Sequence, residues 1–187
     1  MIQRRTIVLA SGIVLFAGCT TTSGGTADPA AKRREIDASV DNSLAQLFSK
    51  AQGSRELVDK ARGVLVMPKV VTAGFVVGGS YGQGALRKHG VTAGYYDVLA
   101  GSVGLLAGAE SKAIYMLFMS QEALDKFEAS KGWTAGADAS VAIANVGAAA
   151  NMDTKTAQAP IIGYVLTNAG LMANLSLDGT KFNKLDL

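Results

Sequence analysis

The residues able to carry chemistry are few, which limits what this chain can do. Among 187 residues there is one cysteine, Cys19, and one histidine, His89. A disulfide within the chain is therefore excluded, and a zinc site of the cysteine and histidine type lacks its ligands. The spacing of Asp97, Glu110 and Asp138 does not pair any two of them as a general acid and base. We therefore expect no catalytic residues, no metal, no cofactor and no enzymatic activity.

Cys19 lies at the end of a segment that has the pattern of a secretory signal. Residues 4–5 are arginines, residues 7–16 form an apolar stretch, and two small residues precede the cysteine. Residues 16–19 (Phe-Ala-Gly-Cys) resemble the lipobox of bacterial lipoproteins. That resemblance implies cleavage before Cys19, acylation of this residue and lipid anchoring in the bacterial cell envelope. Thr20, where an aspartate would indicate the inner membrane, favours the outer membrane. The alternative is an ordinary secretory signal with an incidental cysteine.

Composition and charge indicate a folded body that does not bind nucleic acid. Hydrophobic residues make up 49% of the chain and charged residues 18%, which is too apolar for a disordered chain. The net charge is +3, from 18 basic and 15 acidic residues, but two of the arginines lie in the predicted signal. The remaining body is close to neutral, which disfavours a nucleic-acid partner. We expect a signal over residues 1–18, a flexible tether over 19–27 and a single domain over 28–187.

The first part of the domain has helical periodicity. Asp28 before Pro29 predicts a helix start, and Gly53 predicts its end. A second, short helix is expected from Ser54, as its cap, to Ala61. The apolar positions that recur at helical spacing in the first helix are Ile36, Val40, Leu44, Leu47 and Phe48.

From residue 63 onward the pattern is that of strands rich in glycine. A short apolar strand ends at Pro68, and one further helix begins at Ser120. Other strands are expected near 74–87, 91–107, 110–119, 133–150, 161–167, 171–177 and 180–185. Together these elements predict an α+β fold. It has a strongly bent, mostly antiparallel sheet or partial barrel, two N-terminal helices and one inserted helix.

The glycine cluster at residues 78–84 does not fit a phosphate-binding loop. Its spacing differs from the dinucleotide fingerprint, no helical pattern follows it, and the Gly-Lys-Ser/Thr of a P-loop is absent. We expect structural glycines here, as at two positions near the C-terminus. The glycines assigned this structural role are Gly78, Gly79, Gly82, Gly84, Gly170 and Gly179.

Two groups of basic residues are candidate sites for lipid headgroups. Lys32, Arg33 and Arg34 lie at the start of a helix with an apolar stripe, which is the pattern of an interfacial helix. Arg87 and Lys88 lie at a predicted strand end, and an arginine can hold a phosphate through two parallel hydrogen bonds. The alternatives are a helix turn and a strand end whose charges are simply solvated.

Two stretches of this sequence resemble SYLF domains. Residues 78–87 (Gly-Gly-Ser-Tyr-Gly-Gln-Gly-Ala-Leu-Arg) are similar to the glycine-rich core of that family. Residues 170–179 (Gly-Leu-Met-Ala-Asn-Leu-Ser-Leu-Asp-Gly) resemble its C-terminal signature, usually Gly-Leu-Phe-Ala-Gly-Val-Ser-Leu-Glu-Gly. The second stretch departs from the signature at Met172 and Asn174, and the similarity extends from Ala38 to Leu185.

The family includes bacterial lipoproteins and eukaryotic membrane proteins that bind phosphoinositides and the actin machinery. The resemblance therefore implies lipid binding without catalysis. Combined with the lipobox, it predicts an anchored domain that binds phospholipid or phosphoinositide-like headgroups at a membrane surface. The alternative is a structural or protein-interaction module of the envelope in which lipidation serves only as an anchor. The sequence identifies no protein partner.

Overall fold

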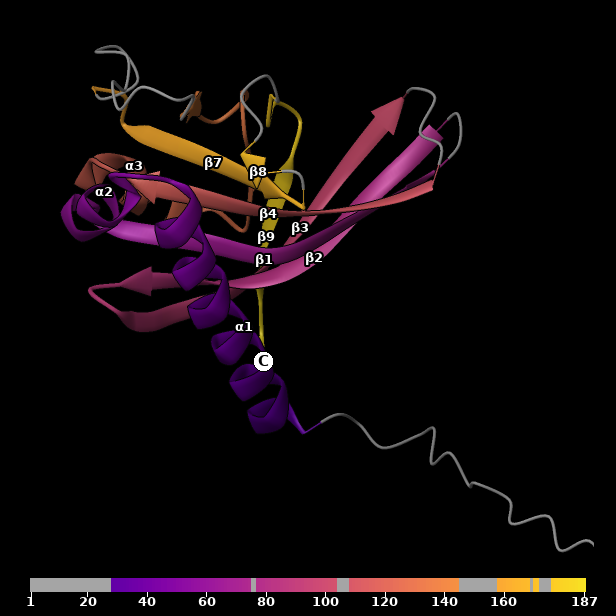
Figure 1. Cartoon of the computed structure of the whole chain (residues 1–187), viewed down its shortest axis with the longest axis horizontal. Coiled ribbons are helices and arrows are strands. Elements are labelled where there is room, and N and C mark those ends of the chain that lie inside the picture. Colours follow the sequence, from indigo (N-terminus) through magenta and orange to yellow (C-terminus); the bar gives the residue numbers. More distant parts are fainter. Residues whose placement is uncertain (1–27, 75–76, 104–107, 145–157, 169, 172–175) are drawn as a thin grey trace, which may run out of the picture.

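The computed structural model describes residues 28–74, 77–103, 108–144, 158–168, 170–171 and 176–187 (Figure 1). Within these ranges the chain forms three helices and one nine-stranded sheet. The predicted signal and tether, residues 1–27, lie outside them, as do parts of the strands expected at 133–150 and 171–177. The helices are α1 (Pro29–Lys50), α2 (Ser54–Lys60) and α3 (Gln121–Ala129). The strands are β1 (Gly63–Gly74), β2 (Val77–Lys88), β3 (Val91–Val103), β4 (Gly108–Phe118), β5 (Gly132–Thr134), β6 (Ala142–Ile143), β7 (Ile161–Thr167), β8 (Gly170–Leu171) and β9 (Lys181–Leu185).

The sheet is mostly antiparallel and curls into a half-barrel, which confirms the predicted fold class. Its strand order is β5-β9-β3-β2-β1-β4-β7-β6, and β8 pairs with β7. The pairing of β6 with β7 is parallel and the other strand pairs described are antiparallel. β9 pairs with part of β3, and β7 pairs with part of β4. Past these paired parts, the four long strands β1 to β4 extend away from the three helices (Figure 1).

Glycines permit the close approach of neighbouring strands in the middle of the sheet. A Cβ on Gly84 would lie 1.9 Å from the carbonyl oxygen of Val66, and one on Gly82 would lie 2.6 Å from that of Lys69. A larger residue at either position therefore displaces backbone. The structural role predicted for these two glycines is supported, whereas a Cβ on Gly79 would meet no atom within 4 Å.

The other predicted structural glycines lie at turns and at a strand end. Gly179 has φ +78° in the turn before β9, and Gly170 has φ +122° at the start of β8, so both backbones are strained for other residues. Gly78 opposes Gly74 in the register of β1 and β2. A Cβ on Gly74 would lie 2.3 Å from the Cα of Gly78, so this pair also packs backbone on backbone.

Strand β1 does not end at Pro68 as predicted but continues through it to Gly74. Val66 pairs with Ala85 and Lys69 with Gln83, so two residues of β1 between these pairs oppose one of β2, and a shift of one residue also occurs against β4. Pro68 thus lies in a β-bulge, one of the few places within a sheet where a residue without an N–H is tolerated.

Each face of the sheet carries its own apolar core. One face, with Val64, Val66 and Tyr115, packs against α1 and α2, and we refer to it as the α1 face. The other face carries Leu65 and the side chains that pack against α3, which we call the α3 face. On the α3 face, four rings stack in sequence with centroids 4.9 to 6.0 Å apart; they belong to Tyr96, Phe127, Trp133 and Phe182.

The helix starts were predicted with one error. Asp28 caps α1 by accepting a hydrogen bond from the amide of Ala30 at 3.0 Å, as expected. Ser54, however, is the first residue of α2 and not its cap. Gly53 occupies the cap position with φ +79°, because the tight connection from α1 needs a left-handed residue there. The Ser54 hydroxyl instead donates to the carbonyl of Leu47 in α1 at 3.3 Å.

Two buried tyrosines of the α1 face differ in their hydrogen bonding. The Tyr115 hydroxyl lies 2.7 Å from the Ser43 hydroxyl and donates to the Ser43 carbonyl at 2.9 Å. The Tyr164 hydroxyl is buried without a hydrogen-bond partner among the described residues. Burial raises the pKa of both side chains, that of Tyr164 to about 12.

Replacing these tyrosines by phenylalanine should have opposite effects on stability. Tyr115→Phe removes hydrogen bonds to Ser43 and leaves the buried Ser43 hydroxyl without this partner, so it should lower the free energy of unfolding by about 1–2 kcal/mol. Tyr164→Phe removes a buried hydroxyl that makes no hydrogen bond, so it should be neutral or stabilising. Urea unfolding of both variants measures the difference, and equal losses would contradict it.

Candidate functional site

Helix α1 is held on the sheet by a partly buried ionic cluster around Asp37. This carboxylate accepts hydrogen bonds from the Thr92 hydroxyl at 2.7 Å and the Tyr95 hydroxyl at 2.9 Å. Arg87 Nη2 lies 2.7 Å from Asp41 Oδ1 and 3.5 Å from Asp37 Oδ1, and it also donates to the Asp37 carbonyl at 3.3 Å. Burial, together with the hydrogen bond to Asp37, raises the pKa of Tyr95. The cluster fixes the middle of α1 over β2 and β3.

The predicted headgroup cations at the end of β2 are both engaged within the protein. The Arg87 side chain is only 13% exposed, and its charge faces two carboxylates of α1. Lys88 lies 2.9 and 3.0 Å from the two carboxylate oxygens of Glu128 in α3. The sequence shows no acid beside either residue because these partners lie about 40 to 50 positions away. Arg87 thus has a structural role in positioning α1.

The three cations at the start of α1 are placed differently from one another. Lys32 pairs with Glu35 at 3.2 Å, and Arg34 lies 3.9 Å from Asp28, both at exposed or half-exposed positions. Arg33 donates a hydrogen bond to the backbone oxygen of Leu187. Of the five predicted headgroup cations, Arg87 lines a smaller pocket of about 290 Å³, where Asp41 already neutralises it, and Lys32 lines a larger groove.

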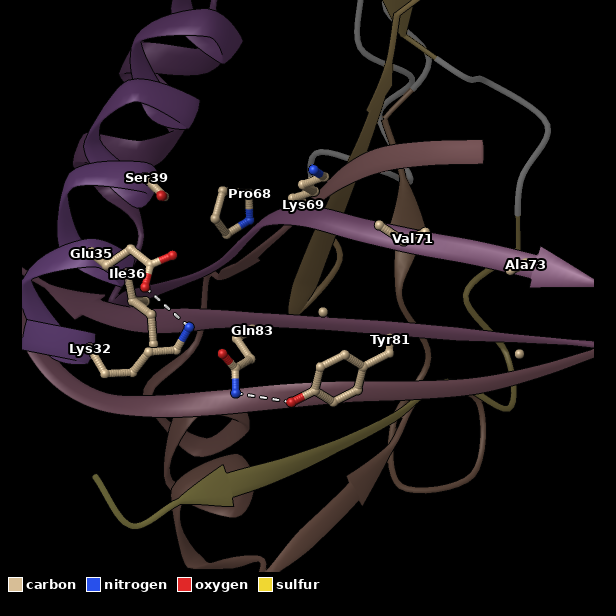
Figure 2. Close-up of a pocket in the computed structure, with 12 residues that line it drawn as sticks. Lys32, Glu35, Ile36, Ser39, Pro68, Lys69, Val71, Ala73, Tyr81 and Gln83 are labelled. Carbon is tan, nitrogen blue, oxygen red and sulfur yellow. Dashed lines mark hydrogen bonds and ion pairs between the residues drawn. The ribbon is translucent and has the colours of Figure 1, made fainter. Parts of the chain in front are cut away.

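The groove lies between the first half of α1 and strands β1 and β2, and has a volume of about 470 Å³. Figure 2 shows Ile36 and Glu35 of α1 on one side of it and Tyr81 and Gln83 of β2 on the other. Its wall is mostly carbon, and the side chains that line it with polar ends are Lys32, Glu35, Ser39, Lys69, Tyr81 and Gln83. Such a lining suits an amphiphile with an apolar tail and an anionic head.

The groove continues into an exposed part of the α1 face, which we call the uncovered face. Its members are Val71, Ala73, Val77, Gly79, Tyr81, Leu99 and Gly101. The register places them in cross-strand rows, with Val71, Tyr81 and Leu99 opposite one another in the first and Ala73, Gly79 and Gly101 in the second. Val77 lies two residues before Gly79 on the same side of β2. Of the five large apolar side chains exposed in the described residues, four belong to this face: Val71, Val77, Tyr81 and Leu99.

The other residues with chemical potential are dispersed. His89 lies in the β2–β3 turn with φ 50°, Asp97 accepts a hydrogen bond from Asn183 at 2.8 Å, and Asp138 accepts one from the Thr134 amide at 2.6 Å. In the part of the chain that the structure describes, no three histidine, cysteine or acidic residues lie close enough to hold a metal. None of the helices described there has the length and apolarity needed to cross a bilayer.

Comparison with known families agrees with the resemblance found in the sequence. The family model described as Ysc84, Las17-binding protein actin regulator, matches residues 99–186. This match supports assignment of the chain to the SYLF-domain family. It runs from the second half of β3 to β9 and includes the signature at residues 170–179, while Lys32 and Lys69 of the groove lie before it. No curated protein matches the chain.

The sequence of this SYLF domain carries only a weak signal for Lys69, a single basic residue after Pro68, and none that identifies the uncovered face as part of a site. Val71 and Ala73 are two positions apart, and Val77 and Tyr81 are four apart, which is the spacing of an apolar strand face. This spacing does not show whether a helix covers that face. The bulge at Pro68 also reverses the alternation along β1. Only the spatial extent of α1 shows which half of the face stays exposed.

Loss of the Asp37 carboxylate should loosen α1. Asp37→Ala leaves the hydroxyls of Thr92 and Tyr95 without their acceptor, so the free energy of unfolding should fall by about 2 kcal/mol. Glu35→Ala, on the exposed side of the same helix, removes only a solvent-exposed pair with Lys32 and should change the free energy of unfolding little. Thermal and urea unfolding compare the two variants, and equal effects would show that the cluster does not hold the helix.

Proposed function

We propose that this SYLF domain binds anionic phospholipid at a membrane surface, without catalysis, and is held there by acyl chains on Cys19. The observation that carries the proposal is the apolar groove of about 470 Å³ with amines at its margin. Its lining offers carbon surface to an acyl chain and positive charge to a headgroup. Its one carboxylate, Glu35, is engaged by Lys32.

The two lysines of the groove differ in what holds them. Lys32 pairs with Glu35 in a contact whose acid is 69% exposed, and such pairs contribute little to stability. A headgroup phosphate can therefore replace Glu35 as its partner at small cost. Lys69 is exposed, and among the described residues no carboxylate lies within ion-pair distance of it. Both amines are thus accessible to an external anion.

The predicted anchor supports the same location. Lys32 lies in the first turn of α1, and nine residues separate Cys19 from that helix. Nine residues span at most about 30 Å when extended. Acyl chains on Cys19 would therefore hold the groove within this distance of the bilayer and raise its effective concentration there. We propose the outer membrane of the bacterial envelope as the site of anchoring.

The proposal predicts lipid binding that survives loss of the anchor. The chain from residue 19 onward with Cys19→Ser keeps every described residue and cannot be acylated. It should pellet with vesicles containing phosphatidylglycerol, more weakly with pure phosphatidylcholine, and less as salt rises, because exposed charges are screened. Lys32→Ala with Lys69→Ala should reduce binding to the anionic vesicles about thirtyfold, at roughly 1 kcal/mol per cation.

The matched control replaces two cations that lie outside the groove, Lys60 and Lys126. This pair should leave binding nearly unchanged although it removes the same net charge. Equal absence of pelleting with neutral and anionic vesicles would overturn the proposal. It would favour a module that contacts envelope proteins, with lipidation as an anchor alone.

A further inference from the structure

We infer that the uncovered face docks on the bilayer itself, so that the groove opens toward the lipid. The inference rests on the proposed lipid-binding function and adds the surface and the orientation through which binding occurs. Exposure is the first observation: Val77 is 72% exposed, Tyr81 49%, Leu99 46% and Val71 38%. Soluble surfaces carry single exposed apolar residues, whereas adjacent ones gathered on one strand face mark an interaction surface.

The shape of this face suits a flat and fluid partner. Gly79 and Gly101 lie opposite each other in its second row, and a Cβ on either would meet no atom within 4 Å. Close packing therefore does not require glycine at these two positions, unlike at Gly82 and Gly84. Their lack of side chains leaves the sheet backbone open between the apolar rows. Figure 1 shows the end of β1, the start of β2 and the end of β3 projecting away from the helices, in keeping with the exposure of Val71, Val77 and Leu99.

The charge around the face favours an anionic surface over a second copy of the chain. Lys69 lies on β1 two residues before Val71, and Lys181 opposes Leu99 at the end of the first row. The two rows contain no carboxylate among their described side chains, since Glu110 opposes Thr72 and so belongs to the α3 face. The neighbouring row, which holds Lys69, also holds Asp97, but this carboxylate accepts a hydrogen bond from Asn183 within the sheet. Two copies packed face to face would bring these lysines near their own equivalents, whereas anionic headgroups neutralise them.

Tyr81 has the chemistry of a residue at a water–lipid boundary. Its ring belongs to the face and its hydroxyl accepts a hydrogen bond from Gln83 Nε2 at 2.9 Å. Tyrosine is enriched at membrane interfaces because the ring is apolar and the hydroxyl remains hydrated. Val71, Ala73 and Gly79 of the face also line the groove, as Tyr81 does, so an acyl chain can pass from the bilayer into the groove along this shared surface.

A single environment-sensitive probe tests this orientation. Cys19→Ser in the chain from residue 19 onward removes its one cysteine, so Gly101→Cys can be labelled with a nitrobenzoxadiazole fluorophore. The matched control is Ala129→Cys, an exposed small residue at the end of α3, on the opposite side of the sheet. With vesicles of phosphatidylglycerol and phosphatidylcholine, emission from position 101 should rise severalfold and shift to shorter wavelength, while position 129 stays unchanged.

The possible outcomes separate the inference from the function on which it rests. If the unlabelled chain pellets with vesicles but the emission of the fluorophore at position 101 does not change, the docking surface is overturned and lipid binding stays supported. Absence of pelleting would overturn both. If the emission from position 101 rises without vesicles and light scattering gives twice the mass of one chain, the face binds a second copy of the chain, which also overturns the inference.

A charge placed on the face gives an independent readout. Gly101→Asp adds a carboxylate in open space, so the fold should persist, but binding to anionic vesicles should weaken about tenfold. Ala129→Asp adds the same charge on the other side and should weaken binding much less. Equal weakening would mean that net charge, and not this face, governs binding.

Discussion

The one-residue bulge at Pro68 determines which side chains of β1 lie on which face of the sheet. Before the bulge, Val64 and Val66 belong to the core under α1; after it, Val70 belongs to the core under α3. Val71 therefore returns to the α1 face, where it aligns with Tyr81 of β2. With strict alternation from Val66, Val71 would lie on the α3 face. The groove wall and the uncovered face both follow from this shift.

Helix α1 provides the second constraint, because it covers only part of the face to which it is fixed. Polar contacts of Asp37 with Arg87 and of Ser43 with Tyr115 attach it over the half of the sheet that is closed by the core. Lys32, Glu35, Ile36 and Ser39 of the same helix line the groove. Ionic and hydroxyl contacts thus fix the helix while leaving an apolar surface beside it. A binding domain can keep such a surface open because the fold does not depend on covering it.

Much of this architecture could be predicted from local sequence signals, and the site could not. Asp28-Pro29 and Ser120 correctly indicated helix starts, because helix caps depend on neighbouring residues. The strand through Pro68 was missed since a bulge depends on both partner strands. The partners of Arg87 and Lys88 were missed for a similar reason. Their carboxylates come from helices distant in sequence, and long-range pairing leaves no local pattern.

The central claim is that the body of the protein holds phospholipid, and native mass spectrometry of the chain with Cys19→Ser tests it most directly. Purified from bacterial membranes in mild detergent and without the acyl anchor, the protein should carry added mass equal to an anionic phospholipid. The adduct should diminish when Lys32 and Lys69 are both replaced by alanine. A spectrum with only the bare chain, in a sample that retains its fold by circular dichroism, would contradict the account.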